Sequence, residues 1–75
     1  MLLNTHFANR PSGLLASQAG YQLPIRVLKS AAGFYIGTCI DDEGPVSRES
    51  VEYWPTQSAA IAALQDNTWT QRSHP

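Results

Sequence analysis

The sequence has few of the residues that hold small domains together covalently or through a metal. Cys39 is the only cysteine among 75 residues, so an internal disulfide is excluded. His6 and His74 lie near opposite ends, and no C-x-x-C or H-x-x-x-H spacing occurs, so we predict no metal and no cofactor. A chain of this length buries only about 60% of its unfolded surface. Self-association or a protein partner is therefore the expected supplement to its stability.

Long apolar runs and a basic leader are also missing. The sequence has no run of about 18 apolar residues, which a membrane-spanning helix needs. Its first residues do not combine a basic region with a long apolar core, as a signal peptide does. We therefore expect a cytoplasmic protein that does not contact membranes.

Neither sign of charge dominates the chain. Five Lys and Arg residues stand against six Asp and Glu residues, which gives a formal net charge of −1. The basic residues are scattered in the sequence, so a protein steered mainly by nucleic-acid phosphates is not favoured. Five of the six carboxylates lie within residues 41–52, so a local negative patch is expected there.

The apolar pattern predicts three strands. Residues 23–29 and 34–40 alternate in type and are rich in β-branched or aromatic side chains, with a tight turn ending at Gly33 between them. Residues 51–54 alternate again and are expected to pair with the second strand. Residues 46–50 are either the rest of a long loop or the entry to this third strand.

One helix is predicted after the strands. Thr56 is a good N-cap, the following residues are strong helix formers, and Asn67 suits a left-handed C-cap. The predicted fold is α+β: a three-stranded antiparallel meander with one C-terminal helix packed on one face. The expected division is a flexible N-terminal arm (1–20), a single domain (21–72) and a frayed tail (73–75).

A single helix covers only one face of such a sheet. The predicted core consists of apolar residues from the strands and the helix: Ile25, Val27, Phe34, Ile36, Ile40, Ile61 and Leu64. The other face would carry Arg26, Leu28, Tyr35 and Cys39 by the alternation of strand side chains. Either this face is a contact surface, or the N-terminal arm or Trp69 folds over it.

The sequence has no signature of catalysis. Ser47 and Ser50 have no neighbouring histidine to act as a base, and no glycine-rich loop is spaced to hold a phosphate. Adjacent acids in the turn at 41–45 are usually solvated. We therefore predict that the protein is not an enzyme.

The recognition chemistry is concentrated between residues 35 and 54. The predicted partner-binding residues are Tyr35, Asp41, Asp42, Glu43, Arg48, Glu49, Tyr53 and Trp54. Arg48 has two alternative roles. It either forms an internal salt bridge with one of the surrounding glutamates, or it belongs to a recognition loop that meets a partner.

Several motifs in this stretch follow a recurrent pattern. They are Tyr35-Ile36-Gly37-Thr38, Asp42, Gly44-Pro45, Ser47-Arg48-Glu49-Ser50, Tyr53-Trp54 and Thr56. In these motifs the chain resembles short, mostly uncharacterised accessory proteins of bacteria and of their plasmids, integrative elements and phages. The resemblance implies a setting and no activity: such accessory proteins often bind host factors, and anti-CRISPR and other anti-defence inhibitors are among them.

The resulting functional hypothesis is a non-enzymatic protein-binding accessory protein that inhibits a host defence nuclease complex. The alternatives are a small nucleic-acid-associated regulator, which would stack bases on exposed aromatic residues, and an interaction domain that acts as a homodimer.

Overall fold

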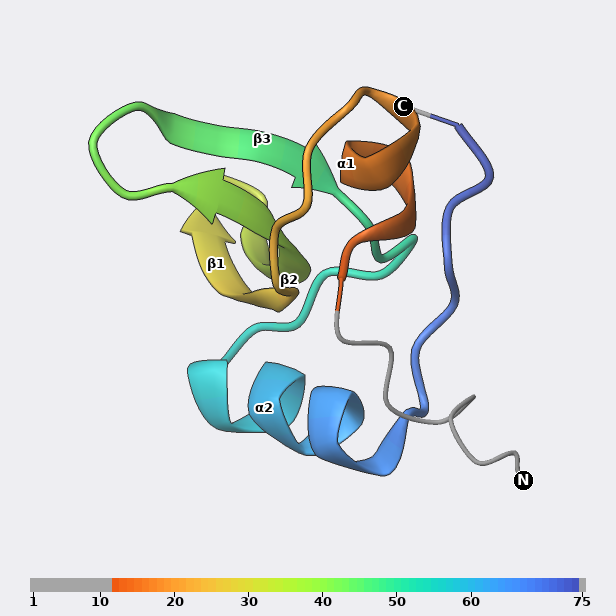
Figure 1. Cartoon of the computed structure of the whole chain (residues 1–75). Coiled ribbons are helices and arrows are strands. Elements are labelled where there is room, and N and C mark those ends of the chain that lie inside the picture. Colours follow the sequence, from red (N-terminus) through yellow and green to blue (C-terminus); the bar gives the residue numbers. More distant parts are fainter. Residues whose placement is uncertain (1–11, 75) are drawn as a thin grey trace.

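The computed structural model describes residues 12–74 and shows a three-stranded sheet with two helices (Figure 1). The elements, in chain order, are α1 (Leu14–Gln18), β1 (Arg26–Ser30), β2 (Gly33–Ile40), β3 (Gly44–Arg48) and α2 (Gln57–Asp66). The strands lie in the order β1-β2-β3 and neighbours are antiparallel. The predicted α+β class, with an antiparallel meander and one well-defined C-terminal helix, is confirmed. Among the described residues, neither helix is long and apolar enough to cross a membrane.

The first hairpin forms as the local sequence predicts. Ser30 pairs with Gly33 across a two-residue turn. The Ser30 hydroxyl accepts a hydrogen bond from the Ala32 N–H at 3.2 Å and donates to the Gly33 carbonyl at 3.1 Å. Gly33 has a φ of 130°, a conformation that favours glycine. Turn chemistry within four residues is therefore sufficient to define this hairpin.

The predicted position of the third strand is wrong. The strand is β3, at residues 44–48, whereas residues 51–54 form only an isolated bridge between Trp54 and Phe34. β3 contains Pro45, which an edge strand tolerates because its missing N–H is not needed by a neighbour. A register shift between Thr38 and Cys39 accommodates the extra residue on β3. The alternation in residues 51–54 arises without a strand, because Trp54 packs against the core while Tyr53 is exposed.

Helix α2 has the predicted caps but not all of the predicted contacts. The Thr56 hydroxyl accepts a hydrogen bond from the Ala59 N–H at 3.1 Å, and Asn67 adopts the left-handed conformation. The helix packs on β1 and β2 through its small residues Ala60 and Ala63. Ile61, a predicted core residue, is exposed instead, because the buried face of the helix is formed by Ala60 and Ala63.

The core lies between α2 and one face of the sheet. Ile36, Ala63 and Trp69 are buried at its centre, and Ile25, Val27, Trp54 and Leu64 pack around them. Four predicted core residues are therefore present: Ile25, Val27, Ile36 and Leu64. Phe34 and Ile40 are half-buried outside this cluster.

The two ends of the described chain are ordered against the sheet. Residues 12–20, which were predicted to belong to a flexible arm, include α1, and its Leu15 and Ala16 are buried. Residues 1–11 of that arm lie outside the described residues, as does residue 75 of the predicted frayed tail. The C-terminal segment folds back so that Trp69 packs in the core. In Figure 1 this segment runs from α2 toward α1, along one side of the molecule.

Candidate functional site

Glu49 is the centre of a buried polar cluster. Its side chain is 0% exposed, and its two carboxylate oxygens accept four hydrogen bonds. The donors are the backbone N–H groups of Leu15 (3.0 Å) and Ala16 (3.1 Å), the Ser47 hydroxyl (2.6 Å) and the Gln71 side-chain amide (2.8 Å). These donors belong to α1, β3 and the C-terminal segment. One carboxylate therefore joins three parts of the chain.

The cluster continues into the sheet through hydroxyl groups. Thr38 and Ser47 are a cross-strand pair whose hydroxyl oxygens lie 2.6 Å apart. Because the Ser47 proton is directed to Glu49, the Thr38 hydroxyl is the donor in this pair. Gly13 lies directly above, since a Cβ atom there would meet Glu49 Oε2 at 2.5 Å and Thr38 Cγ2 at 2.6 Å. Glycine is needed at position 13 for this close approach.

The hydrogen bonds determine the ionisation of Glu49. Burial favours the neutral acid, but the bonds from Ser47, Leu15, Gln71 and Ala16 outweigh it, so that the pKa of Glu49 lies below its ordinary value. The carboxylate is therefore charged at neutral pH and stabilised by its donors.

This position corrects the role that was expected for Glu49. A fully buried side chain does not reach a partner, so Glu49 is a structural residue. The neighbouring Ser50 is also buried. Its hydroxyl accepts a hydrogen bond from the Ile36 N–H at 3.0 Å and donates to the Glu52 carbonyl at 2.9 Å. The polar run at residues 47–50 is largely interior, not a displayed loop.

The opposite face of the sheet carries an aromatic cluster. Tyr35 lies across Gly37, because a Cβ atom at Gly37 would be 2.8 Å from the Tyr35 ring. Tyr53 meets the Tyr35 ring edge to face, with centroids 5.9 Å apart. The guanidinium carbon of Arg48 is 4.7 Å from the centroid of the Tyr53 ring. We call Tyr35, Arg48, Val51 and Tyr53 the Tyr53 surface; Tyr53 and Val51 are its exposed members, at 40% and 53%.

Tyr35 is less accessible than its strand position suggested. It lies on the predicted open face, but it is buried there, with the Tyr53 ring against it. Burial, followed by the proximity of Tyr53 and Cys39, raises the pKa of the Tyr35 phenol. Tyr35 therefore contributes to the surface by packing against the Tyr53 ring and not by direct exposure.

We expect Gly37→Ala to destabilise the protein by about 1–3 kcal/mol, the usual cost of overpacking. The added methyl group would meet the Ser47 carbonyl oxygen and the Tyr35 ring, so that β3 or the ring must shift. Chemical denaturation followed by fluorescence measures the change. Gly20→Ala adds the same methyl group where nothing lies within 4 Å of a Cβ atom, so any loss there comes from its positive φ alone and is expected to be about 1 kcal/mol. The packing argument is contradicted if the loss in Gly37→Ala does not exceed that in Gly20→Ala.

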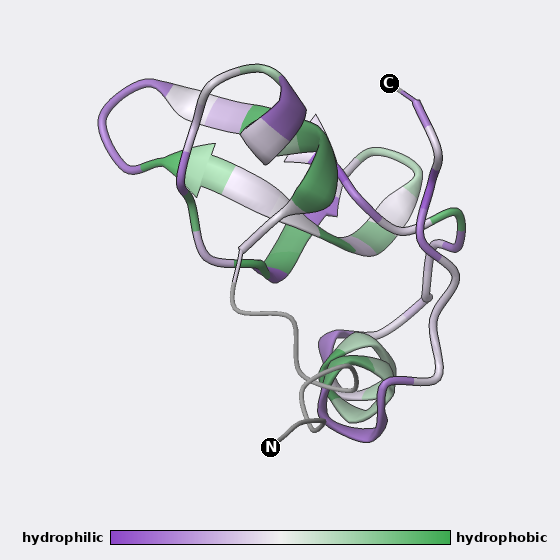
Figure 2. Cartoon of the chain, turned by 45° about the vertical axis from the view of Figure 1, so that its right-hand side comes forward, coloured by the Kyte–Doolittle hydropathy of each residue, from purple (hydrophilic) through white to green (hydrophobic). Residues whose placement is uncertain are grey.

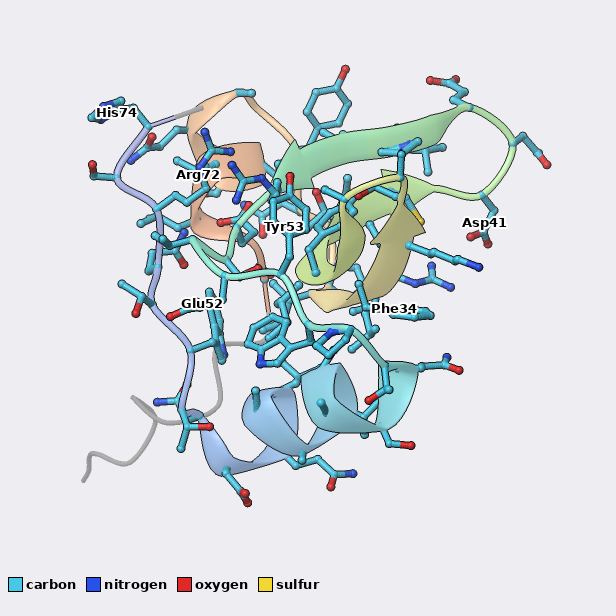
Figure 3. The ribbon with its side chains drawn as sticks, turned by 180° about the vertical axis from the view of Figure 1, so that it is seen from behind. Phe34, Asp41, Glu52, Tyr53, Arg72 and His74 are labelled. Atoms are coloured by element: carbon cyan, nitrogen blue, oxygen red, sulfur yellow. The ribbon has the colours of Figure 1, made fainter. Side chains whose placement is uncertain are left out.

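The acidic turn lies at the far end of the hairpin. Asp41, Asp42 and Glu43 are exposed, and Figure 2 shows this turn as hydrophilic. Asp41 forms a salt bridge with Arg26 at 3.2 Å. Figure 3 places Asp41 at the opposite end of the molecule from Arg72, with Tyr53 between them. The structure therefore does not bring the acidic turn together with the Tyr53 surface.

The remaining predicted residues have separate positions. Trp54 is half-buried and packs against the core, so it contributes chiefly to the fold. Arg48 forms no salt bridge within residues 12–74; its Nη1 atom donates to the carbonyls of Ser50 at 2.7 Å and Val51 at 3.0 Å. The predicted internal salt bridge of Arg48 is therefore wrong, and backbone carbonyls orient its side chain instead.

Sequence reasoning missed Arg72 beside Arg48. Its Nη1 atom donates to the Arg48 carbonyl at 3.1 Å, and its backbone N–H donates to the Glu49 carbonyl at 2.7 Å. Nothing in the local sequence indicates this pairing across 24 residues. The described residues contain no pocket and no group of three or more side chains suited to hold a metal ion.

Comparison with known proteins gives no matching family model, no matching curated protein and no matching solved structure. The resemblance to accessory proteins of mobile elements therefore stays a prediction.

Proposed function

We propose that the chain is a non-enzymatic protein-binding domain and that the Tyr53 surface is its contact site. The observation that carries this proposal is the exposed Tyr53 ring, which is held between Tyr35 and the guanidinium group of Arg48. Tyrosine and arginine are among the residues that dominate binding energy in protein interfaces. Val51, whose carbonyl accepts a hydrogen bond from Arg48, is a further exposed apolar residue.

The fixed geometry of this surface also supports the proposal. Ordering a side chain on binding costs about 0.5–1.5 kcal/mol for each long, flexible residue. Here Arg48 is already held by two carbonyls and by the Tyr53 ring, and Tyr53 is packed on a buried ring. A partner would meet side chains that are oriented before binding, so that less affinity is lost to ordering.

The biological setting follows from the resemblance to mobile-element proteins. In that setting the partner is a host factor, and we propose inhibition of a host defence nuclease complex as the role. Self-association is the alternative use of the same surface. Sedimentation of the purified protein distinguishes a homodimer from a monomer that binds a different protein.

A photo-crosslinking experiment tests the contact site. We expect a benzoylphenylalanine at position 51 to form a defined crosslinked product, either with a protein from a bacterial lysate or with a second copy of the chain. The same group at position 61 is the matched control, since Ile61 is also an exposed apolar residue but lies on α2. The crosslink at position 51 should be lost when Tyr53→Ala is added and the fold is intact by circular dichroism.

The proposal fails if positions 51 and 61 give the same products or none. It also fails if the position-51 product survives Tyr53→Ala unchanged, because Tyr53 is the exposed centre of the surface.

A further inference from the structure

Arg48 of the Tyr53 surface and the neighbouring Arg72 have no acidic partner in the part of the chain that the structure describes. Among residues 12–74, the salt bridge within 4.0 Å is that between Arg26 and Asp41, so neither Arg48 nor Arg72 is paired with a carboxylate. The two nearest glutamates in sequence are engaged elsewhere: Glu49 is buried in its cluster, and Glu52 accepts hydrogen bonds from the Thr70 N–H at 2.9 and 3.1 Å. Within the described residues, Arg48 and Arg72, like Lys29, therefore have no carboxylate within 4.0 Å.

The guanidinium group of Arg48 has one edge occupied and one edge open. Both of its described hydrogen bonds use Nη1, and one face of the group lies against the Tyr53 ring. The Nε and Nη2 groups have no acceptor among the described residues. That pair of groups forms the planar fork that binds a carboxylate through two parallel hydrogen bonds.

Arg72 adds a second positive charge at the same place. Its Nη1 atom is fixed on the Arg48 carbonyl, so its guanidinium group lies at the edge of β3 next to Arg48. In Figure 3, Arg72 and Asp41 lie toward opposite sides of the molecule, with Tyr53 between them. The exposed acidic residues Asp41, Asp42 and Glu43 thus lie at the β2–β3 turn, whereas Glu49 and Glu52, close to the two arginines in sequence, accept hydrogen bonds from other groups.

We propose that the Tyr53 surface binds an acidic segment of a protein partner and that the open edge of Arg48 takes a carboxylate of that segment. Arg72 provides the second positive charge, and Tyr53 and Val51 contact the apolar part of the segment. This inference rests on the proposed function, because it names the chemistry of the partner at the same site.

The charge distribution favours a carboxylate on a protein over the phosphates of a nucleic acid. Nucleic-acid binding usually needs a continuous basic track that follows many phosphates. Here Arg26 already forms a salt bridge with Asp41, and the acidic turn lies at the start of β3, the strand that ends at Arg48. Two arginines and one exposed ring suit a short acidic segment.

Fluorescence anisotropy with labelled hexaglutamate tests this inference. We expect the full chain to bind hexaglutamate at low ionic strength and not hexalysine, with an affinity that falls as salt is added. Arg48→Gln and Arg72→Gln should each weaken binding by about tenfold, the loss typical of a hydrogen bond between charged groups. Arg26→Gln is the matched control and should bind as the unaltered protein does.

Two further variants separate charge, geometry and fold. Arg48→Lys keeps the charge but loses the planar fork, so its affinity should fall between those of the unaltered protein and Arg48→Gln. Arg72→Gln keeps the backbone bond to Glu49, so its fold should be intact even if Arg48→Gln unfolds. The inference is overturned if hexaglutamate does not bind, if Arg26→Gln weakens binding as much as Arg48→Gln and Arg72→Gln do, or if oligothymidylate binds more tightly than hexaglutamate.

The crosslink at position 51 distinguishes the failure of this inference from that of the proposed function. If its product forms equally in the Arg72→Gln and Arg48→Lys variants, the Tyr53 surface is a contact site that does not need an acidic partner. If no specific product forms in the unaltered background, the contact site itself is wrong.

Discussion

Glu49→Ala is expected to remove a large part of the stability of the protein at 25 °C. The substitution removes the acceptor from the buried N–H groups of Leu15 and Ala16 and from the part-buried Ser47 hydroxyl, and it takes one of several acceptors from the Gln71 amide. Each unsatisfied buried group costs about 1–3 kcal/mol, so a loss of about 4 kcal/mol or more is expected. The whole stability of a domain of this size is about 4–11 kcal/mol. Urea denaturation followed by circular dichroism measures the loss.

Glu49→Gln separates shape from charge. The amide has the same volume, but it retains a single acceptor oxygen where the carboxylate has two, and it adds two donors among existing donors. We expect a loss of about 2–3 kcal/mol, since hydrogen bonds to charged groups are worth about 1.5–3 kcal/mol. Asp42→Asn is the matched control, because Asp42 is exposed in the turn and its substitution should change stability by less than about 0.5 kcal/mol.

The dependence of stability on pH provides a second test of Glu49. Because its pKa in the folded protein lies below that of the unfolded chain, the carboxylate contributes stability above the unfolded value of about 4.3. That contribution is lost as the pH falls through the lower, folded value. The difference in the free energy of unfolding between the unaltered protein and Glu49→Gln should therefore become smaller in acid. The gap would stay constant with pH if Glu49 carried no charge-dependent stability.

Glu52 contributes to the same acid sensitivity and has to be measured separately. Burial opposes its ionisation, but hydrogen bonds from Thr70 outweigh it, so that its pKa is also lowered. In a Glu52→Gln variant, the free energy of unfolding should still fall in acid, because Glu49 is present. This fall should be much smaller in Glu49→Gln.

Trp69→Ala should cost about 3–5 kcal/mol, the range for truncating a large aromatic side chain in a core. Trp69 is only 6% exposed and packs with Ile36 and Ala63. Trp69→Phe should recover a large part of the loss, because much of the buried apolar area is kept. Thermal or urea denaturation measures both changes, with the remaining Trp54 as the fluorescent reporter.

A control on the surface completes the test of Trp69. Val51→Ala should change stability by less than about 0.5 kcal/mol, since Val51 is exposed. If Trp69→Ala were as mild as Val51→Ala, the C-terminal segment would not be part of the core.

The elements that sequence reasoning placed correctly are those defined by near neighbours. The β1–β2 hairpin depends on a two-residue turn and on Gly33, and α2 depends on caps at Thr56 and Asn67. All of these signals act within about four residues, which is the range that pattern reading covers. The fold class follows from these elements.

The candidate site was predicted less well because polarity was taken as a sign of exposure. Ser47, Glu49 and Ser50 appear to be a loop when only their side-chain types are considered, although two of them are fully buried. A buried carboxylate is stable only when its donors are supplied, and the donors of Glu49 include residues 22 to 34 positions away. Tyr35, Arg48 and Tyr53 were identified by residue type, but their stacking depends on the register of β3, which the alternation in residues 51–54 misrepresented.

The cluster at Glu49 also constrains the order in which the chain can fold. The β1–β2 hairpin closes across two residues, whereas α1 meets Glu49 across 34 residues and Gln71 meets it across 22. Contacts at such separations form slowly, because loop closure must precede them. During synthesis, α1 emerges well before its acceptor, and the acceptor emerges before its last donor. The cluster that holds α1 through Glu49 is therefore complete only when Gln71 has left the ribosome.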